Sequence, residues 1–411
     1  MEYNKLGHIA KIQTGPFGSQ LHQSDYKPAG IPCIMPCNIG SNLNIICDNI
    51  AYISEDDLNR LAKHKTNEGD IVYSRRGDIE KCAYISSREA GWLCGTGCLK
   101  ISIDSTIAIP KYVAYLLSTP DSKAWLVGNA VGTTMLNLNT TVLSDFPISL
   151  PDLDTQQKVV DIIDAIADKI ELNKRINDNL EQQAQALYKS WFVDFEPFKD
   201  EEFIDSELGM IPKGWAIGKI EDLTLRMASG GTPKSMNPEF YSGDICWFTT
   251  KELVDGFLID SEKHISQSAI DNSAAKIFPK GSVLMAIYAA PTVGRLGILS
   301  CNAAFNQAAV ALIPKVGIGS GYIYLTLYNE RNNFNNLSSG AAQQNLNVGL
   351  VKNYPTRIPS QEVLNNFETK ISPIFMNIER NQREINNLTR LRDTLLPKLM
   401  SGEIKINEID C

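Results

Sequence analysis

The sequence has little histidine and lacks the residue constellations that usually mark a catalytic site. Only four of its 411 residues are histidine, and none stands in a ligand or triad spacing (His8, His22, His64, His264). It contains no Gly-x-x-x-x-Gly-Lys-[Ser/Thr] phosphate loop, no His-Glu-x-x-His pair and no Gly-x-Ser-x-Gly. The Asn/Asp-Pro-Pro-aromatic tetrapeptide of amino-methyltransferases is also absent. The chain is therefore predicted to be non-catalytic, with any chemistry belonging to a partner.

Long apolar runs and a cysteine framework are missing as well. No run of about 18 apolar residues exists, and the N-terminus lacks the apolar core of a signal peptide, so a cytoplasmic protein is expected. The nine cysteines are scattered, which fits a reducing compartment. Cys33 and Cys37, and Cys94 and Cys98, have the spacing of paired zinc ligands, but a structural site normally needs four ligands. Buried small side chains explain them better, so neither a metal nor a cofactor is expected in this chain.

Basic residues are fewer than acidic ones, 39 against 47, but the excess of negative charge is concentrated in one segment. Between Asp194 and Glu207 seven acids stand against Lys199, a net charge of −6 out of −8 for the whole chain. The remainder, at −2, is nearly neutral. A nearly neutral surface binds DNA phosphates weakly, so any DNA binding would need basic partners or local basic loops.

The chain does contain an internal repeat. Gly132 to Asn139 returns as Gly340 to Asn347 at an offset of 208 residues, and Pro147 and Pro151 return as Pro355 and Pro359. Upstream the match is looser: Gly69 aligns with Gly281 at 212, and Cys33 with Cys246 at 213. A duplicated unit with a variable first part and a rigid second part predicts two binding domains on a spacer.

Each repeat begins with a mixed α/β pattern of short strands bounded by Gly and Pro, followed by helix-like segments such as 110–117 and 321–328. The predicted fold class is α+β, with two similar α/β domains separated by a pair of long antiparallel coiled-coil helices and related by a pseudo-two-fold repeat. The predicted regions are a first domain (1–150), a central helical region (151–198), an acidic connector (199–212), a second domain (213–358) and a distal helical region (359–403).

The helices show the periodicity of a coiled coil, with apolar residues spaced alternately by three and four. The first stripe is Ile163, Ile166, Ile170, Asn173, Asn177, Leu180, Ala184, Leu187 and Trp191. The second is Ile371, Ile374, Ile378, Asn381, Ile385, Leu388, Arg392, Leu395 and Leu399. Matched length and phase favour pairing of the two helices over packing of each on its own domain.

Asn173 and Asn381 occupy equivalent positions in the two stripes. One interpretation is that they hydrogen-bond between the helices and determine the register of the pair, at some cost in stability. The alternative is that each side chain reaches a solvated edge of a wide interface.

Several loops are rich in groups that can contact base edges. Arg75 and Arg76 follow a strand and offer two guanidinium groups suited to guanine or phosphate. The loop 15–20 aligns with 230–234, Asn38 with Lys251, and Thr133-Thr134 with Gln343-Gln344. Any one of these residues is better explained as a solvated or turn-capping group. As a set, however, the residue types at aligned loop positions differ between the two copies, as expected of two domains that read different sequences. The candidate DNA-binding residues are Ser19, Gln20, Asn38, Arg75, Arg76, Thr133, Thr134, Lys234, Lys251, Asn306, Gln307, Gln343 and Gln344.

Three segments closely resemble the specificity (S) subunit of type I restriction–modification enzymes. These are 187–198, the segment 207–215 that enters the second domain, and 394–403 near the C-terminus. The resemblance covers essentially the whole chain. It implies two target recognition domains, each reading half of a split DNA site, and two antiparallel helices that space them and dock two methylation subunits. Base-contacting residues vary in that family, so none is transferred to this chain.

The resemblance implies a DNA-reading subunit of a type I restriction–modification complex that recognises a bipartite, asymmetric site. Partner subunits would use S-adenosylmethionine to methylate adenine at N6 after base flipping, and restriction subunits would use ATP and Mg²⁺ to cleave unmodified DNA. Two alternatives stay open: an autonomous methyltransferase-type enzyme, which the missing tetrapeptide argues against, and a coiled-coil interaction protein without DNA function, which the Arg/Asn/Gln differences between the loops argue against.

Overall fold

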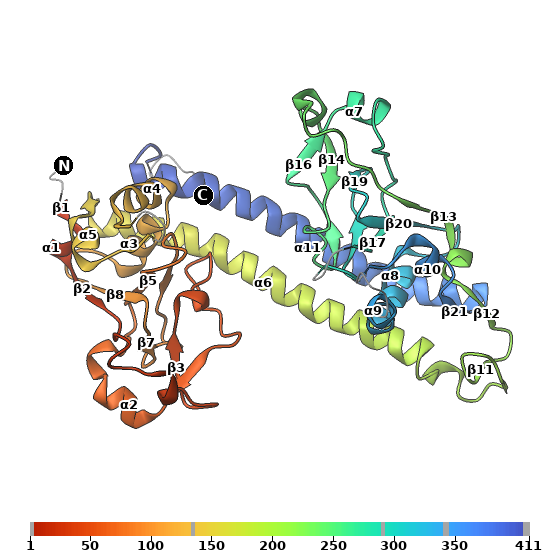
Figure 1. Cartoon of the computed structure of the whole chain (residues 1–411), viewed down its shortest axis with the longest axis horizontal. Coiled ribbons are helices and arrows are strands. Elements are labelled where there is room, and N and C mark those ends of the chain that lie inside the picture. The colour runs from red at the N-terminus through yellow and green to blue at the C-terminus, as the bar shows by residue number, and fades with distance from the viewer. Residues whose placement is uncertain (1–3, 133–135, 289–291, 340–344, 406–411) are drawn as a thin grey trace. The chain divides into compact units, whose positions relative to one another are not determined.

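A computed structural model describes residues 4–132, 136–288, 292–339 and 345–405 of the chain (Figure 1). The chain forms two compact units. The first consists of residues 1–168 and 388–411, and the second of residues 169–387. In the described residues no helix is long and apolar enough to cross a bilayer.

The first unit is built on a four-stranded antiparallel sheet. Its strand order is β2 (Ala10–Thr14), β8 (Cys98–Ile103), β5 (Ile71–Ser74) and β6 (Cys82–Tyr84). The central strands are buried on both faces, and they share a core with the helices that follow β8. These helices are α3 (Pro110–Leu117), α4 (Pro120–Asn129) and α5 (Thr140–Asp145).

A smaller sheet extends the first unit. The strand β3 (Ile31–Ile34) pairs antiparallel with β4 (Ala51–Ile53) and parallel with β7 (Leu93–Cys94). The first unit also contains α1 (Leu6–Ile9), α2 (Glu55–Arg60), and the pair β1 (Asn4–Lys5) and β9 (Pro147–Ile148).

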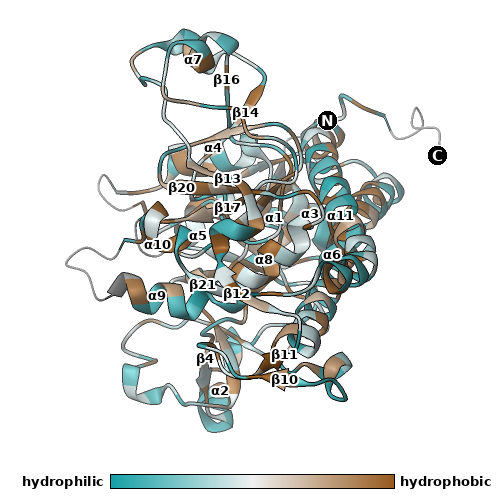
Figure 2. Cartoon of the chain, turned by 90° about the vertical axis from the view of Figure 1, so that its right-hand side faces the viewer, coloured by the Kyte–Doolittle hydropathy of each residue, from teal (hydrophilic) through white to brown (hydrophobic). Residues whose placement is uncertain are grey.

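The second unit repeats this topology and adds one strand to the larger sheet. Its larger sheet has the order β13 (Thr224–Ser229), β20 (Ala309–Pro314), β17 (Val283–Ala286), β18 (Leu296–Leu299), with β15 (Phe257–Leu258) added at the edge. Its smaller sheet has the order β16 (Lys263–Ile265), β14 (Ile245–Phe248), β19 (Ala304–Phe305), again with one antiparallel and one parallel pairing. The other elements are α7 (Gln267–Asp271), α8 (Ser320–Asn329), α9 (Arg331–Ser339), α10 (Val348–Lys352), β12 (Ala216–Lys219) and β21 (Pro355–Ile358). The strands β17 and β20 consist mainly of hydrophobic residues, whereas α7 is largely hydrophilic (Figure 2).

Local hydrogen bonds confirm the repeat at the offset of 208. The side chain of Asn139 accepts from the backbone N–H of Val142 at 2.8 Å and caps α5, and Asn347 accepts from Leu350 at 2.9 Å and caps α10. Two equivalent asparagines thus begin two equivalent helices.

The upstream alignment at an offset of 213 is wrong by one residue. In the parallel strand pairs, Ile34 lies opposite Cys94 and Phe248 opposite Phe305, which gives an offset of 214 for these strands. Cys33 therefore corresponds to Trp247, not to Cys246. Because successive side chains of a strand point to opposite faces, the shift places Cys33 in the core and leaves Cys246 partly exposed.

Two long helices complete the fold, α6 (Leu153–Phe192) and α11 (Gln361–Ser401). Every residue of both predicted stripes is buried or partly buried, which confirms the predicted periodicity. The helices run antiparallel in the second unit, since Asn173 contacts Glu384 whereas Asn177, one turn later, contacts Ile378 and Asn381.

The asparagines of the stripes form hydrogen bonds between the two helices. Asn381 Nδ2 donates to Asn177 Oδ1 at 2.9 Å, and Asn173 Nδ2 donates to Glu384 Oε2 at 2.9 Å. Asn177 Nδ2 also lies 3.4 Å from the carbonyl oxygen of Ile378. Asn173 and Asn381 are both buried, but the bonds join each of them to another residue. A role in determining register stays a prediction, and it now includes Asn177.

Two of the three segments that carry the family resemblance, 187–198 and 207–215, pack on one another in the second unit, whereas 394–403 lies in the first unit. Phe192 contacts Phe367 of α11 with ring centroids 4.8 Å apart, and Phe198 contacts Trp215 at 5.3 Å. Between these residues, β10 (Phe203–Ile204) pairs with β11 (Ile211–Pro212), so the acidic connector is a hairpin. The aromatic residues of these motifs are therefore accounted for as core.

Candidate nucleic-acid interface

Three chain segments converge at one edge of the larger sheet in the first unit. Thr14 of β2 lies opposite Leu99, and Ser74 of β5 lies opposite Cys98, so β2 and β5 end where β8 begins. The loops that follow β2 and β5 therefore meet the loop that precedes β8. Binding residues are commonly carried by loops held in this way on a rigid sheet.

This convergence requires glycine at one position in each unit. A Cβ atom on Gly15 would lie 2.0 Å from the carbonyl oxygen of Gly95, and one on Gly230 would lie 2.1 Å from that of Phe305. No side chain fits at either position without moving the backbone. The recognition edge of a unit is defined here as the surface formed by the segments 15–20, 75–77 and 136–139 of the first unit, and 230–234, 287–288, 306–308 and 345–347 of the second.

Arg75 lies at the centre of the first recognition edge. Its backbone N–H donates to the Gly97 carbonyl at 2.8 Å, and its Nε donates to Asn137 Oδ1 at 3.1 Å. Its guanidinium carbon lies 5.7 Å from the ring centroid of Phe17, whose side chain is 53% exposed. Partial burial and the neighbouring Arg76 lower the pKa of Arg75. A held guanidinium next to an exposed ring suits contact with a base edge and an unpaired base face.

The other candidates of the first unit have different surroundings. Ser19 and Arg76 are exposed, and Gln20 is partly buried, with its side-chain oxygen accepting from the Phe17 N–H at 3.2 Å. Asn38 is buried: its Oδ1 accepts from the Met35 N–H at 3.0 Å, and its Nδ2 donates to the Ile46 carbonyl at 3.1 Å. Because its amide is used within the fold, Asn38 is not a candidate for base contact in this structure.

The position of Asn38 in the second unit is also corrected by one residue. Glu252 accepts from the Thr249 N–H at 2.7 Å, as Asn38 does from Met35, and both pairs differ by 214. Asn38 therefore corresponds to Glu252, and the exposed Lys251 has a neighbouring position. Sequence alignment did not reveal the equivalence of Asn38 and Glu252, because both residues cap a turn and different side chains can do so.

The second recognition edge has the same frame with other side chains. Trp247 Nε1 donates to the Gly231 carbonyl at 3.0 Å, and Thr232 Oγ1 donates to Gln307 Oε1. Asn306 accepts from the Ala308 N–H at 3.1 Å, which shapes the loop before β20. Gln307 and Lys234 are exposed on this edge.

Four candidates, Thr133, Thr134, Gln343 and Gln344, lie outside the described residues. In both units, a leucine that follows these residues in sequence forms a backbone hydrogen bond just beyond the end of an equivalent strand, β5 or β17. Leu138 N–H donates to the Arg75 carbonyl at 3.0 Å, and Leu346 N–H donates to the Ile287 carbonyl at 2.9 Å.

These two bonds show which residues of the two recognition edges are equivalent, a correspondence that the sequence alone did not reveal. At an offset of 212, Arg75 and Arg76 of the first unit correspond to Ile287 and Tyr288 of the second. Ile287 is buried, whereas the Tyr288 ring is 39% exposed. Tyr288, like Phe17, was not among the candidates. The available signal was an aromatic residue two or three residues beyond the end of a strand, since β2 ends at Thr14 and β17 at Ala286.

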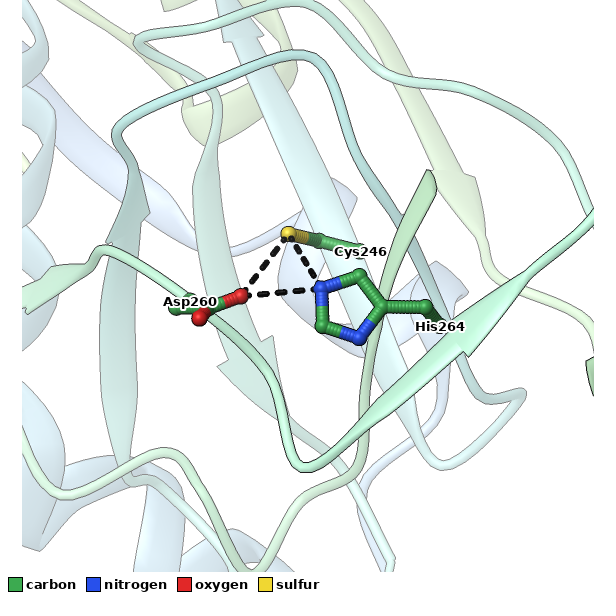
Figure 3. A group of neighbouring side chains, drawn as sticks. All are labelled: Cys246, Asp260 and His264. Carbon is green, nitrogen blue, oxygen red and sulfur yellow. Dashed lines mark hydrogen bonds and ion pairs between the residues drawn. The ribbon is translucent and has the colours of Figure 1, made fainter. Parts of the chain in front are cut away.

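The cysteines of the first unit are mostly core residues. Cys33, Cys94 and Cys98 are fully buried, whereas Cys37 is exposed, which confirms the interpretation of the first three as small buried side chains. Burial raises the pKa of the Cys33 thiol to about 12. The sequence spacing of the histidines suggested no ligand set, but in the structure His264 lies beside Cys246 and Asp260 (Figure 3).

The duplicated fold, with two matching loop edges and two long helices, defines a class of paired recognition modules. A family model described as "Type I restriction modification DNA specificity domain" matches residues 1–182 and 212–392. The chain belongs to this family.

Known relatives match along nearly the full chain. It is 30% identical to the type I restriction enzyme MjaIX specificity subunit of Methanocaldococcus jannaschii, over 99% of this chain and 94% of the relative. It is 26% identical to the HindI specificity subunit of Haemophilus influenzae, over 91% and 95%. The crystal structure of a type I restriction–modification S subunit from M. genitalium shares the fold, with a TM-score of 0.59 at 15% identity, covering 97% of this chain and 95% of that one.

Proposed function

We propose that this chain is the non-catalytic DNA-reading subunit of a cytoplasmic type I restriction–modification complex, and that its two recognition edges read the two halves of a split, asymmetric site. Each edge presents polar and aromatic groups at the ends of the same strands. The two sets differ, and two different half-sites need different sets of contacts.

The observation that carries this proposal is the replacement of Arg75 and Arg76 by Ile287 and Tyr288 on equivalent backbone. Two guanidinium groups favour guanine or phosphate contacts, whereas an exposed tyrosine favours stacking or a single hydrogen bond. A protein that used both edges for the same ligand would have no reason to differ at this position.

The catalytic work is assigned to partners. We infer that two methylation subunits bind the long helices and use S-adenosylmethionine to methylate adenine at N6, and that restriction subunits use ATP and Mg²⁺ to cleave unmodified DNA. On α6, Leu172 and Ile176 are four residues apart and are 52% and 38% exposed, so they offer an apolar surface beside the buried stripe.

The test is methylome sequencing of cells that carry the methylation subunits with this chain or with its variants. Arg75→Ala with Arg76→Ala is expected to relax or abolish one half-site and leave the other unchanged, and Tyr288→Ala is expected to affect only the other half. Arg88 is the matched control, because it follows β6 at the opposite end of the sheet. If Arg88→Ala changes the motif as strongly, or if both half-sites change together, the assignment of the edges is wrong.

The autonomous methyltransferase is tested with the isolated chain. Incubation with S-adenosylmethionine and DNA containing the site is expected to give no methyl transfer until the methylation subunits are added. Transfer by the isolated chain would overturn the non-catalytic assignment.

A further inference from the structure

Three side chains that commonly bind transition metals meet on the small sheet of the second unit. Cys246 of β14 lies directly opposite His264 of β16, so both side chains project from the same face of the sheet. Asp260 precedes His264 by four residues and turns back toward it. Figure 3 shows the three groups pointing toward one another.

The spacing of their ligand atoms matches a tetrahedral metal site. Cys246 Sγ lies 3.6 Å from Asp260 Oδ1 and 3.7 Å from His264 Nε2, and Nε2 lies 2.9 Å from Oδ1. With a Zn–S bond of about 2.3 Å and Zn–N and Zn–O bonds of about 2.0–2.1 Å, tetrahedral angles require sulfur–nitrogen and sulfur–oxygen separations of about 3.5 Å and a nitrogen–oxygen separation of about 3.3 Å. Shifts of a few tenths of an ångström would bring all three atoms onto one ion.

We propose that Cys246, Asp260 and His264 bind a Zn²⁺ ion, with water in the fourth position. A thiolate, an imidazole and a carboxylate together select zinc over the hard cations Mg²⁺ and Ca²⁺, which prefer oxygen ligands. The side chains of His264 and Asp260 are 33% and 30% exposed, so an ion can reach them from solvent.

Hydrogen bonds of Ser261 hold the turn that carries Asp260. The N–H of Ser261 donates to Asp260 Oδ1 at 3.0 Å, and the Ser261 hydroxyl accepts from the Trp247 N–H at 3.0 Å and donates to the Lys263 carbonyl at 2.6 Å. Ser261 thereby ties the turn that carries Asp260 to both strands that carry the other ligands. Groups that hydrogen-bond to a metal ligand without contacting the metal contribute strongly to metal affinity.

The first unit supplies an internal comparison. The strand pairing that places Cys246 opposite His264 places Pro32 opposite Tyr52 in the first unit. The same frame therefore folds without a thiol or an imidazole at these positions. The three ligands are an addition to the second unit and not a requirement of the sheet, which favours a specific role over packing.

The experiment uses the full-length chain, expressed with zinc, dialysed and analysed for metal content. One equivalent of zinc is expected. Cobalt, titrated into the metal-free protein, is expected to give a thiolate-to-cobalt charge-transfer band and tetrahedral d–d bands. Cys246→Ser and His264→Gln are expected to lower the affinity for cobalt more than about 100-fold, since even outer-shell changes cost 10- to 100-fold. Cys37→Ser, which removes an exposed thiol of the first unit, is the control.

Thermal unfolding separates loss of metal from loss of fold. With chelator present, the wild type and both variants are expected to unfold at similar temperatures, and zinc but not magnesium should raise the transition of the wild type alone. The proposal is overturned if the wild type shows no thiolate–cobalt band, if Cys246→Ser retains it, or if Cys37→Ser removes it. It is also overturned if zinc leaves the wild-type transition unchanged while both variants unfold earlier in chelator, because the three residues would then form only a hydrogen-bonded group. None of these outcomes depends on DNA recognition.

Discussion

The hydrogen bond between Asn177 and Asn381 predicts a sharp non-additivity. Both side chains are buried, with 5% and 6% exposure, and Asn381 donates to Asn177 at 2.9 Å. Asn381→Leu would leave Asn177 Oδ1 without its donor, and Asn177→Leu would leave Asn381 Nδ2 without its acceptor. Each single variant should lose about 1–3 kcal/mol of unfolding free energy, the cost of a buried unsatisfied polar group.

The double variant removes both polar groups at once and leaves an apolar stripe. Its stability should equal or exceed that of the wild type, so that the coupling energy in the double-mutant cycle is about 2–6 kcal/mol, the sum of the two single losses. The measurement is urea or thermal unfolding of the full chain. For a unit of this size, the loss in each single variant corresponds to a fall of roughly 2–12 °C in Tm.

Asn173→Leu is the matched control. Its partner Glu384 is 41% exposed and can turn to water, so this change should cost less than either single variant at the buried pair. If the two single effects simply add, or if the double variant is the least stable of the set, the Asn177–Asn381 bond does not act as described. If the double variant forms no mispaired or aggregated species, the asparagines are not needed for register.

Four further outcomes follow from the structure. Gly15→Ala should displace the loop after β2, lower stability by about 2 kcal/mol or more and abolish one half-site, whereas Gly18→Ala, whose Cβ would meet nothing within 4 Å, should be neutral in both melting and methylome assays. Insertion of one heptad after Leu172 and one after Glu384 lengthens each helix by about 10 Å. The gap between half-sites should therefore grow by about three base pairs while both half-sites persist. A changed half-site with an unchanged gap would contradict this prediction. The isolated chain, which is nearly neutral outside residues 194–207, should bind its site with a Kd weaker than about 1 µM at physiological salt. Addition of methylation subunits should tighten binding unless Leu172→Asp with Ile176→Asp prevents their docking; tight specific binding by the chain alone would refute this prediction. A fragment of residues 1–200 should form a homodimer in which α6 of the second copy takes the place of the missing α11 stripe. With methylation subunits, this homodimer should methylate a palindrome built from one half-site and its reverse complement. A fragment that is monomeric by light scattering would show that the halves are not interchangeable.

The large-scale architecture was predictable because it depends on repetition and periodicity. The offset of 208 between Asn139 and Asn347 survives in the structure because both asparagines cap a helix of the same frame. The stripes from Ile163 and from Ile371 were readable because a long helix repeats its environment every seven residues.

The surface details were less predictable, since short strands tolerate insertions in their loops. A one-residue error in the offset moved Cys246 to the wrong face and concealed its approach to His264. Asn38 looked like a polar loop residue, but it satisfies backbone groups that only the folded turn brings together. Phe17 and Tyr288 were missed because an exposed aromatic residue looks like a core residue in sequence.

The division of the chain into units has a consequence for its biosynthesis. Residues 388–411 belong to the first unit, and Leu396 and Leu399 are part of its core with Val159 and Ile163. The ribosome therefore delivers the first 168 residues long before the segment that completes their core, whereas residues 169–387 are contiguous. At about 5–20 residues per second, the wait is roughly ten to fifty seconds. During that interval the nascent first unit exposes the apolar face of α6 around Ile163. We expect chaperones to bind this surface and two nascent chains to be able to exchange helices across it.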